Sequence, residues 1–167
     1  MRNEELLSKG TTYEDIKKYA DEEQLAMIKV QAQVCTYEGY KKEELKEIQK
    51  DINIAVFVEN RCGDAQTMVP ILKEITKVND KIKLSYFEAS KYDAFLIEKV
   101  GEKKVPMILF LRGESEVSSV YNEFPIKVRA LIEANPDNRE FIVKEEFRKG
   151  KYNIEVEKDI VEAILGV

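Results

Sequence analysis

Cys62 is the residue of this chain whose type and surroundings point most directly to chemistry. It follows the polar run Glu59-Asn60-Arg61 and precedes Gly63. These neighbours predict a partly exposed thiol, which becomes a nucleophile toward another sulfur once it is deprotonated. The alternative interpretation is a buried, unreactive thiol.

The elements around Cys62 place it at a strand-to-helix junction. The apolar run Ile54–Val58 predicts a strand that is buried on both faces. After the cysteine, apolar residues recur with the spacing of one helical stripe, at Met68, Ile71, Leu72 and Ile75. Free N–H groups and the positive end of the helix dipole meet at such a junction, which favours a thiolate by about 0.3–1 kcal/mol, or about 2 kcal/mol when partly buried.

Charged residues on either side of Cys62 act in opposite directions. Arg61 favours the thiolate and Asp64 opposes it, and neither clearly outweighs the helix terminus. Asp64 also has a purely structural interpretation, because an acidic residue in the first turn of a helix is favourable whatever the cysteine does.

A family resemblance rests on an ordered set of residues. The run Arg61-Cys62-Gly63-Asp64-Ala65-Gln66 is followed by Pro70, eight positions after Cys62, and by Val105-Pro106, whose proline stands forty-four positions after it. Together they resemble the thioredoxin superfamily, and more narrowly the subgroup whose site reads Trp-Cys-Gly-Asp followed by a small residue. The resemblance covers about residues 52–121. It implies an α/β, thioredoxin-like fold: a central mixed sheet of about four strands flanked by helices, with extra helices at both ends.

The resemblance also implies roles for individual residues. Cys62 would be the catalytic nucleophile, and substrate would be bound by Arg61, Gly63, Asp64, Val105 and Pro106. A cis Val105-Pro106 bond would lie beside Cys62 and leave the Val105 backbone free to pair with an extended substrate. The alternative for Pro106 is a proline that simply begins a strand.

This sequence departs from the family pattern at the position of the second thiol. In dithiol members that thiol stands three residues after the first cysteine, where this chain has Ala65. Exchange through Cys62 is therefore monothiol at most, and an external thiol, a partner or Cys35 must resolve the mixed disulfide. Cys35 falls on the apolar face of a predicted helix with Leu25, and we expect it to be a small buried hydrophobe.

Two further departures concern docking and proton transfer. Arg61 replaces a tryptophan that shapes the docking surface in the family. Val56 stands where thioredoxins keep a buried carboxylate for proton transfer, which leaves Glu59 or Asp64 for that role.

Three functions follow from these features. The leading one is a thioredoxin-like thiol-disulfide oxidoreductase that acts as a monothiol through Cys62 on protein or low-molecular-weight disulfides. The alternative is a redox-inactive binding or scaffold module with a thioredoxin fold. A third is an iron-sulfur carrier that shares a cluster between two subunits through Cys62.

The remaining pattern predicts how the chain is organised. Strands are expected at 52–58, 82–88, 107–111 and 116–121, and helices at 64–78, 93–100 and 125–134. Before this core, a capping box formed by Thr11 and Glu14 opens a helix that reaches Ala20, and two more helices follow, the last at 42–50. Two helices separated near Gly150 follow the core. We expect one domain over 1–167, with a core at 52–135 and helical extensions at 1–51 and 136–167.

Composition excludes several classes of function. The net charge of −5 and the alternation of Lys with Glu argue against nucleic-acid binding, which needs clustered basic charge. With no histidine and two cysteines, a four-ligand zinc site would need carboxylates, so we expect neither a metal site nor a cofactor. No apolar run is long enough to span a membrane, and the first ten residues lack the apolar core of a signal peptide. We therefore expect a cytoplasmic protein. In that compartment the two cysteines are expected to be reduced thiols.

Overall fold

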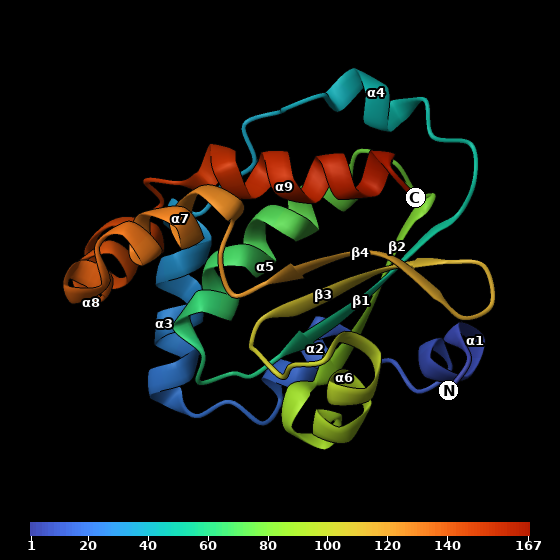
Figure 1. Ribbon diagram of the computed structural model, residues 1–167, viewed down its shortest axis with the longest axis horizontal. Coiled ribbons are helices and arrows are strands. Elements are labelled where there is room, and N and C mark those ends of the chain that lie inside the picture. Colours follow the sequence, from blue (N-terminus) through green and yellow to red (C-terminus); the bar gives the residue numbers. More distant parts are fainter.

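A four-stranded mixed sheet forms the centre of the computed structural model, which describes all 167 residues (Figure 1). The strands are β1 (Ile52–Val58), β2 (Ile82–Glu88), β3 (Met107–Arg112) and β4 (Glu116–Asn122), in the spatial order β2-β1-β3-β4. β1 is parallel to β2 and antiparallel to β3, and β3 forms an antiparallel hairpin with β4. The two central strands are the ones with continuous apolar runs, as expected for strands covered on both faces.

Alternate residues of β1 face two separate apolar clusters. Ile54 and Val56 pack with residues of α5 (Gly63–Thr76), α7 (Ile126–Ala134) and α9 (Asn153–Leu165). Ala55 and Phe57 pack with residues of α1 (Asn3–Leu7) and α6 (Asp93–Val100), and a short 3₁₀ turn, η1 (Ala89–Lys91), joins β2 to α6. In Figure 1, α5 and α9 lie on one side of the sheet and α6 on the other. The predicted α/β arrangement with helices on both faces is confirmed.

The N-terminal helices differ from prediction at their ends. α1 was not predicted, and it is followed by α2 (Tyr13–Lys17), α3 (Glu22–Val34) and α4 (Lys42–Lys46). The capping box of α2 pairs Thr12 with Asp15, one residue later than the predicted Thr11 and Glu14. The reason is that the Thr11 backbone bonds to Tyr86 in β2, which holds it outside the helix.

The predicted apolar face of α3 was only partly right. Cys35 is buried as expected, but it forms the C-cap of the helix, and Leu25 is exposed. α4 ends before the predicted residue 50. The side-chain amide of Asn79 donates to the carbonyl oxygens of Leu45 (2.9 Å) and Ile48 (2.9 Å), and it thereby satisfies the groups at the end of a short helix.

An irregular segment connects α7 to α9. It consists of η2 (Pro136–Asn138), α8 (Arg139–Phe141), the π-helical turn η3 (Ile142–Glu146) and the 3₁₀ turn η4 (Phe147–Lys149). Gly150 breaks the helical pattern, as predicted, with a φ of 84°. The turn is anchored by Phe147, which is buried against Phe124 with ring centroids 5.2 Å apart, and by Asn153, whose amide donates to the Val34 carbonyl at 2.8 Å.

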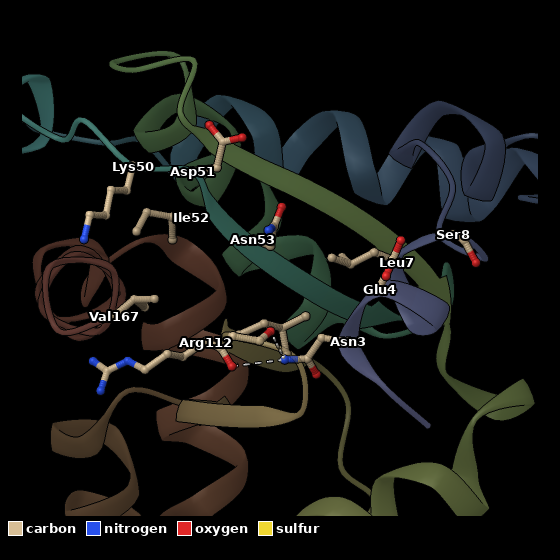
Figure 2. Close-up of a pocket in the computed structure, with 12 residues that line it drawn as sticks. Asn3, Glu4, Leu7, Ser8, Lys50, Asp51, Ile52, Asn53, Arg112 and Val167 are labelled. Atoms are coloured by element: carbon tan, nitrogen blue, oxygen red, sulfur yellow. Dashed lines mark hydrogen bonds between the residues drawn. The ribbon is translucent and has the colours of Figure 1, made fainter.

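A cavity of about 750 Å³ lies where the chain enters β1 (Figure 2). Lys50 and Asn53 line it from the start of β1, and Arg112 and Val167 line it from the other side. Asn3 closes one wall, because its amide donates to the carbonyl oxygens of Gly113 (3.1 Å) and Glu116 (3.0 Å). Cys62 follows the other end of β1, so this cavity is remote from the predicted site. None of the helices combines the length and apolar character needed to cross a bilayer.

Candidate functional site

Cys62 occupies the N-cap of α5 with extended backbone angles (φ −88°, ψ 106°). Its N–H donates to the Glu59 carbonyl at 3.1 Å, which closes the turn after β1. Its own carbonyl accepts from the Gln66 N–H at 3.1 Å, which is the first bond of the helix. The half-buried thiol therefore lies at the predicted strand-to-helix junction.

The thiol faces the loop that leads into β3. Its Sγ donates to the Val105 carbonyl oxygen at 3.4 Å, and the Val105-Pro106 peptide bond is cis. Pro106 is buried, and its carbonyl accepts from the Glu123 N–H at 2.8 Å. The structure thus brings Cys62, Val105 and Pro106 together at one end of the sheet.

Gly63 and Asp64 are covered by a residue from the far end of the chain. The Arg148 Nε donates to Asp64 Oδ1 at 2.8 Å. The same guanidinium lies against Gly63, where an added Cβ would stand 2.7 Å from Arg148 Cζ. The C-terminal segment therefore packs over the first turn of α5, directly beside Cys62.

Burial has the largest influence on the pKa of the Cys62 thiol. Removal from water raises the pKa of Cys62 above that of a free thiol. The amide of Ala65 lowers this pKa, the charge of Asp64 raises it further, and the charge of Arg148 lowers it. Desolvation, which the sequence pattern did not reveal, is the largest of these effects.

Arg61 and Glu59 both line a hollow that does not include Cys62. Arg61 is exposed, and the hollow, which has a volume of about 280 Å³, is also lined by Ile16 and Glu88. The Glu59 carboxylate accepts from the Ser90 N–H at 2.7 Å. Val56 is fully buried beneath the site. Of the two carboxylates considered for proton transfer, Glu59 is thus bound elsewhere and Asp64 is paired with Arg148.

A family model described as thioredoxin matches residues 10–140. The chain belongs to the thioredoxin family. The match extends beyond residues 52–121, on which the resemblance was based, and includes α2, α3 and α4. Thioredoxin Y, chloroplastic, from Oryza sativa subsp. japonica is 31% identical over 90 residues, which are 53% of this chain and 52% of that protein. The chain therefore spans about half the length of this curated relative.

Two solved structures share the fold of this thioredoxin-family chain. A protein of unknown function from Pseudomonas aeruginosa has a TM-score of 0.80 and 17% identity, over 99% of this chain and 98% of that one. An HIV epitope scaffold has the same TM-score and identity, over 100% and 99% of the two chains. The predicted thioredoxin-like fold with additional terminal helices is confirmed along the whole chain.

Cys35, the second thiol of this thioredoxin-family chain, is buried in the core. It is 1% exposed, and burial raises its pKa to about 11, although the Thr67 hydroxyl opposes the rise. Its Sγ contacts Gln31 Oε1 at 3.5 Å. These observations favour the structural interpretation of Cys35 over a resolving role.

Arg148 is the site residue that the sequence did not reveal. It stands 84 positions after Asp64 in a segment rich in Lys and Glu, so no local signal marks it. Only the packing of the irregular segment onto α5 brings it to Cys62. No group of three or more His, Cys, Asp or Glu side chains is arranged to hold a metal ion.

Proposed function

We propose that this chain exchanges disulfides as a monothiol through Cys62. The observation that supports this most directly is the contact of 3.4 Å between Cys62 Sγ and the Val105 carbonyl, at the helix terminus of a thioredoxin-family fold. Cys62 is the proposed catalytic residue. Gly63, Asp64, Val105 and Pro106 surround it as the proposed substrate-binding surface, and Arg61 lies at its edge.

The proposed reaction needs no oxidant beyond the substrate disulfide. The Cys62 thiolate attacks one sulfur of the substrate, a bond forms between the two sulfurs, and the other substrate sulfur leaves as a thiolate with the electron pair of the broken bond. Because Ala65 offers no second thiol, a low-molecular-weight thiol or a protein thiol then attacks the mixed disulfide. This second step releases Cys62 and leaves the substrate joined to the incoming thiol.

A direct test follows both steps on the intact chain. Incubation with bis(2-hydroxyethyl) disulfide is expected to add one mercaptoethanol group to Cys62, as seen by intact mass and peptide mapping, and glutathione is expected to remove it. Cys62→Ser is the control and should remain unmodified. Absence of the adduct on Cys62, under conditions where the urea-unfolded chain reacts, would contradict the proposal.

A second candidate function is a redox-inactive binding module. The raised pKa of Cys62, caused first by burial, favours it because little thiolate is present at neutral pH. In that case Cys62→Ser should bind the natural partner as well as the parent chain does. If Cys62 exchanges disulfides, the variant should instead fail to form mixed disulfides with proteins of a cell extract.

A further inference from the structure

Arg148 leaves much of its hydrogen-bonding capacity unused. A guanidinium presents five N–H donors in a rigid planar fork. Nε donates to Asp64 Oδ1, whereas Nη1 and Nη2 donate to no group of the protein. The side chain is 30% exposed, so part of it reaches solvent.

The fork lies against the residue that follows Cys62 in the chain. Gly63, the neighbour of Cys62, has no left-handed backbone angle that would require a glycine. The absence of a Cβ instead permits the close approach of Arg148, since a Cβ at Gly63 would lie 2.7–2.8 Å from three guanidinium atoms. A larger residue at this position would make the end of this flexible side chain shift.

Packing of the neighbouring residues also fixes the position of the Arg148 backbone. Phe147 is buried against Phe124, and Gly150 approaches the Val34 carbonyl so closely that an added Cβ would stand 2.5 Å from it. Arg148 lies outside residues 10–140, the part matched by the family model. Its placement is therefore a feature of the C-terminal segment of this chain.

Arg148 is the cation whose unpaired donors lie next to Gly63. Lys104, beside Val105, instead pairs with Glu102 and Glu123. Arg61 lines a different hollow, and the chain as a whole carries a net charge of −5. A carboxylate matches the planar fork of a guanidinium and can accept two parallel hydrogen bonds from it. A general attraction for anions is not expected of this acidic chain, so recognition depends on this contact.

We propose that Arg148 is a substrate-binding residue of the Cys62 site and selects disulfides that carry a carboxylate next to the sulfur under attack. This inference rests on the proposed function. The Cys62 thiolate bonds to the near sulfur, the substrate S–S bond breaks, and the far sulfur leaves as a thiolate. The carboxylate on Arg148 takes no part in the bond changes and only orients the near sulfur.

Three symmetrical disulfides of different charge test the proposal: anionic 3,3′-dithiodipropionate, neutral bis(2-hydroxyethyl) disulfide and cationic cystamine. The rate of adduct formation on Cys62 is measured by mass spectrometry, at one pH and one ionic strength. Arg148→Gln is expected to slow the anionic disulfide about tenfold relative to the neutral one and to speed the cationic one. Any change in the thiolate fraction of Cys62 affects all three rates equally and cancels in their ratios.

Matched variants distinguish the loss of a specific contact with the substrate from a general loss of positive charge. Lys149→Gln removes the same charge from a neighbouring residue that pairs with Glu145, and it should leave the ratios unchanged. Arg148→Lys keeps the positive charge but not the planar fork. Its ratio of anionic to neutral rates should lie between those of the parent chain and Arg148→Gln. Asp64→Asn frees the guanidinium and should increase the preference for the anionic disulfide.

The outcomes distinguish a failure of this inference from a failure of the proposed monothiol exchange on which it rests. If Arg148→Gln changes all three rates by one common factor, the selection of carboxylates is wrong and the monothiol exchange stands. If the parent chain forms no adduct with any of the three disulfides, both proposals fail together.

Discussion

The chemistry of Cys62 is set by two opposing effects at one sulfur. Burial removes the thiol from water and disfavours its charged form, whereas the amides at the start of α5 favour that form. The resting state is therefore a neutral thiol that donates to the Val105 carbonyl. Under the proposed function, a disulfide substrate would compete with that carbonyl for the thiol, and the hydrogen bond holds the thiol toward the Pro106 loop.

Asp64→Asn is expected to make Cys62 more reactive at neutral pH. The substitution removes a negative charge beside the thiolate and releases the positive charge of Arg148, so the pKa of Cys62 should fall. Two unit charges about 6 Å apart in water interact by about 0.7 kcal/mol, which corresponds to a roughly threefold higher thiolate fraction. The rate of alkylation by iodoacetamide between pH 6.5 and 10 measures the shift. Glu59→Gln, which alters a carboxylate bound to the Ser90 amide, is the control and should leave the profile unchanged.

Cys35 is expected to make the fold sensitive to alkaline pH. Its pKa in the folded chain is raised by burial to about 11 from an ordinary value of 9.0, so above pH 9 the unfolded state loses this proton first. The stabilising contribution is complete below pH 9 and is lost as the pH rises to 11. It amounts to about 2–3 kcal/mol. Urea unfolding of the parent chain and of Cys35→Ala at pH 9 and at pH 11 measures this change in the free energy of unfolding. Equal losses in the two proteins would show that Cys35 does not ionise on unfolding.

At the scale of elements, the sequence predicted best where the apolar pattern was dense. The bounds of β1, β2 and α6 agree with prediction, because each is a strong pattern ended by turn residues such as Asn79 and Gly101. The capping box was misplaced by one residue, since Thr11 and Thr12 are chemically equivalent and only the contact of Thr11 with β2 decides between them. Tertiary contacts of this kind are not encoded in local spacing.

Gly150→Ala is expected to destabilise the chain more than Gly101→Ala. Both glycines have nearly the same left-handed angle, with φ values of 84° and 80°. An alanine in that region costs about 1–2 kcal/mol in either place. At Gly150 the new Cβ would also lie 2.5 Å from the Val34 carbonyl, whereas nothing lies within 4 Å at Gly101. This overlap should add about 1–3 kcal/mol, measured by urea unfolding. Equal losses in the two variants would mean that the turn relaxes away from α3.

At the scale of the molecule, contacts between segments far apart in the sequence hold the C-terminal segment in place. Arg148 reaches Asp64 across 84 positions, and the fully buried Glu157 of α9 accepts from the amides of Glu38 and Tyr40, which lie 119 and 117 positions away. Sequence pattern predicted the position of Cys62 at a helix start beside the Pro106 loop, where the structure has it. It could not identify Arg148, because nothing near residue 148 distinguishes it from the other cations of the C-terminal segment.

We propose that residues 1–167 fold as one unit and that a chain ending at residue 135 does not fold. The C-terminal segment supplies five apolar side chains that are at most 1% exposed: Phe147, Val156, Ile160, Val161 and Ile164. Burial of each of these side chains stabilises a fold by about 1.5–3 kcal/mol. The stability lost with all five is therefore comparable to the whole free energy of unfolding of a typical domain, about 5–15 kcal/mol. The truncated chain is therefore expected to lack cooperative unfolding.

The measurement compares two signals during urea unfolding of the full chain. Far-ultraviolet circular dichroism reports all helices, and tyrosine fluorescence reports tertiary packing in a protein that has no tryptophan. Coincident transitions are expected, because one apolar cluster contains Tyr13 from the N-terminal helices, Val56 from the sheet and Ile160 from α9. Separate transitions, or a cooperative transition in the chain that ends at residue 135, would show that the C-terminal helices are an independent addition. Arg148 would then reach Cys62 only while that addition is docked.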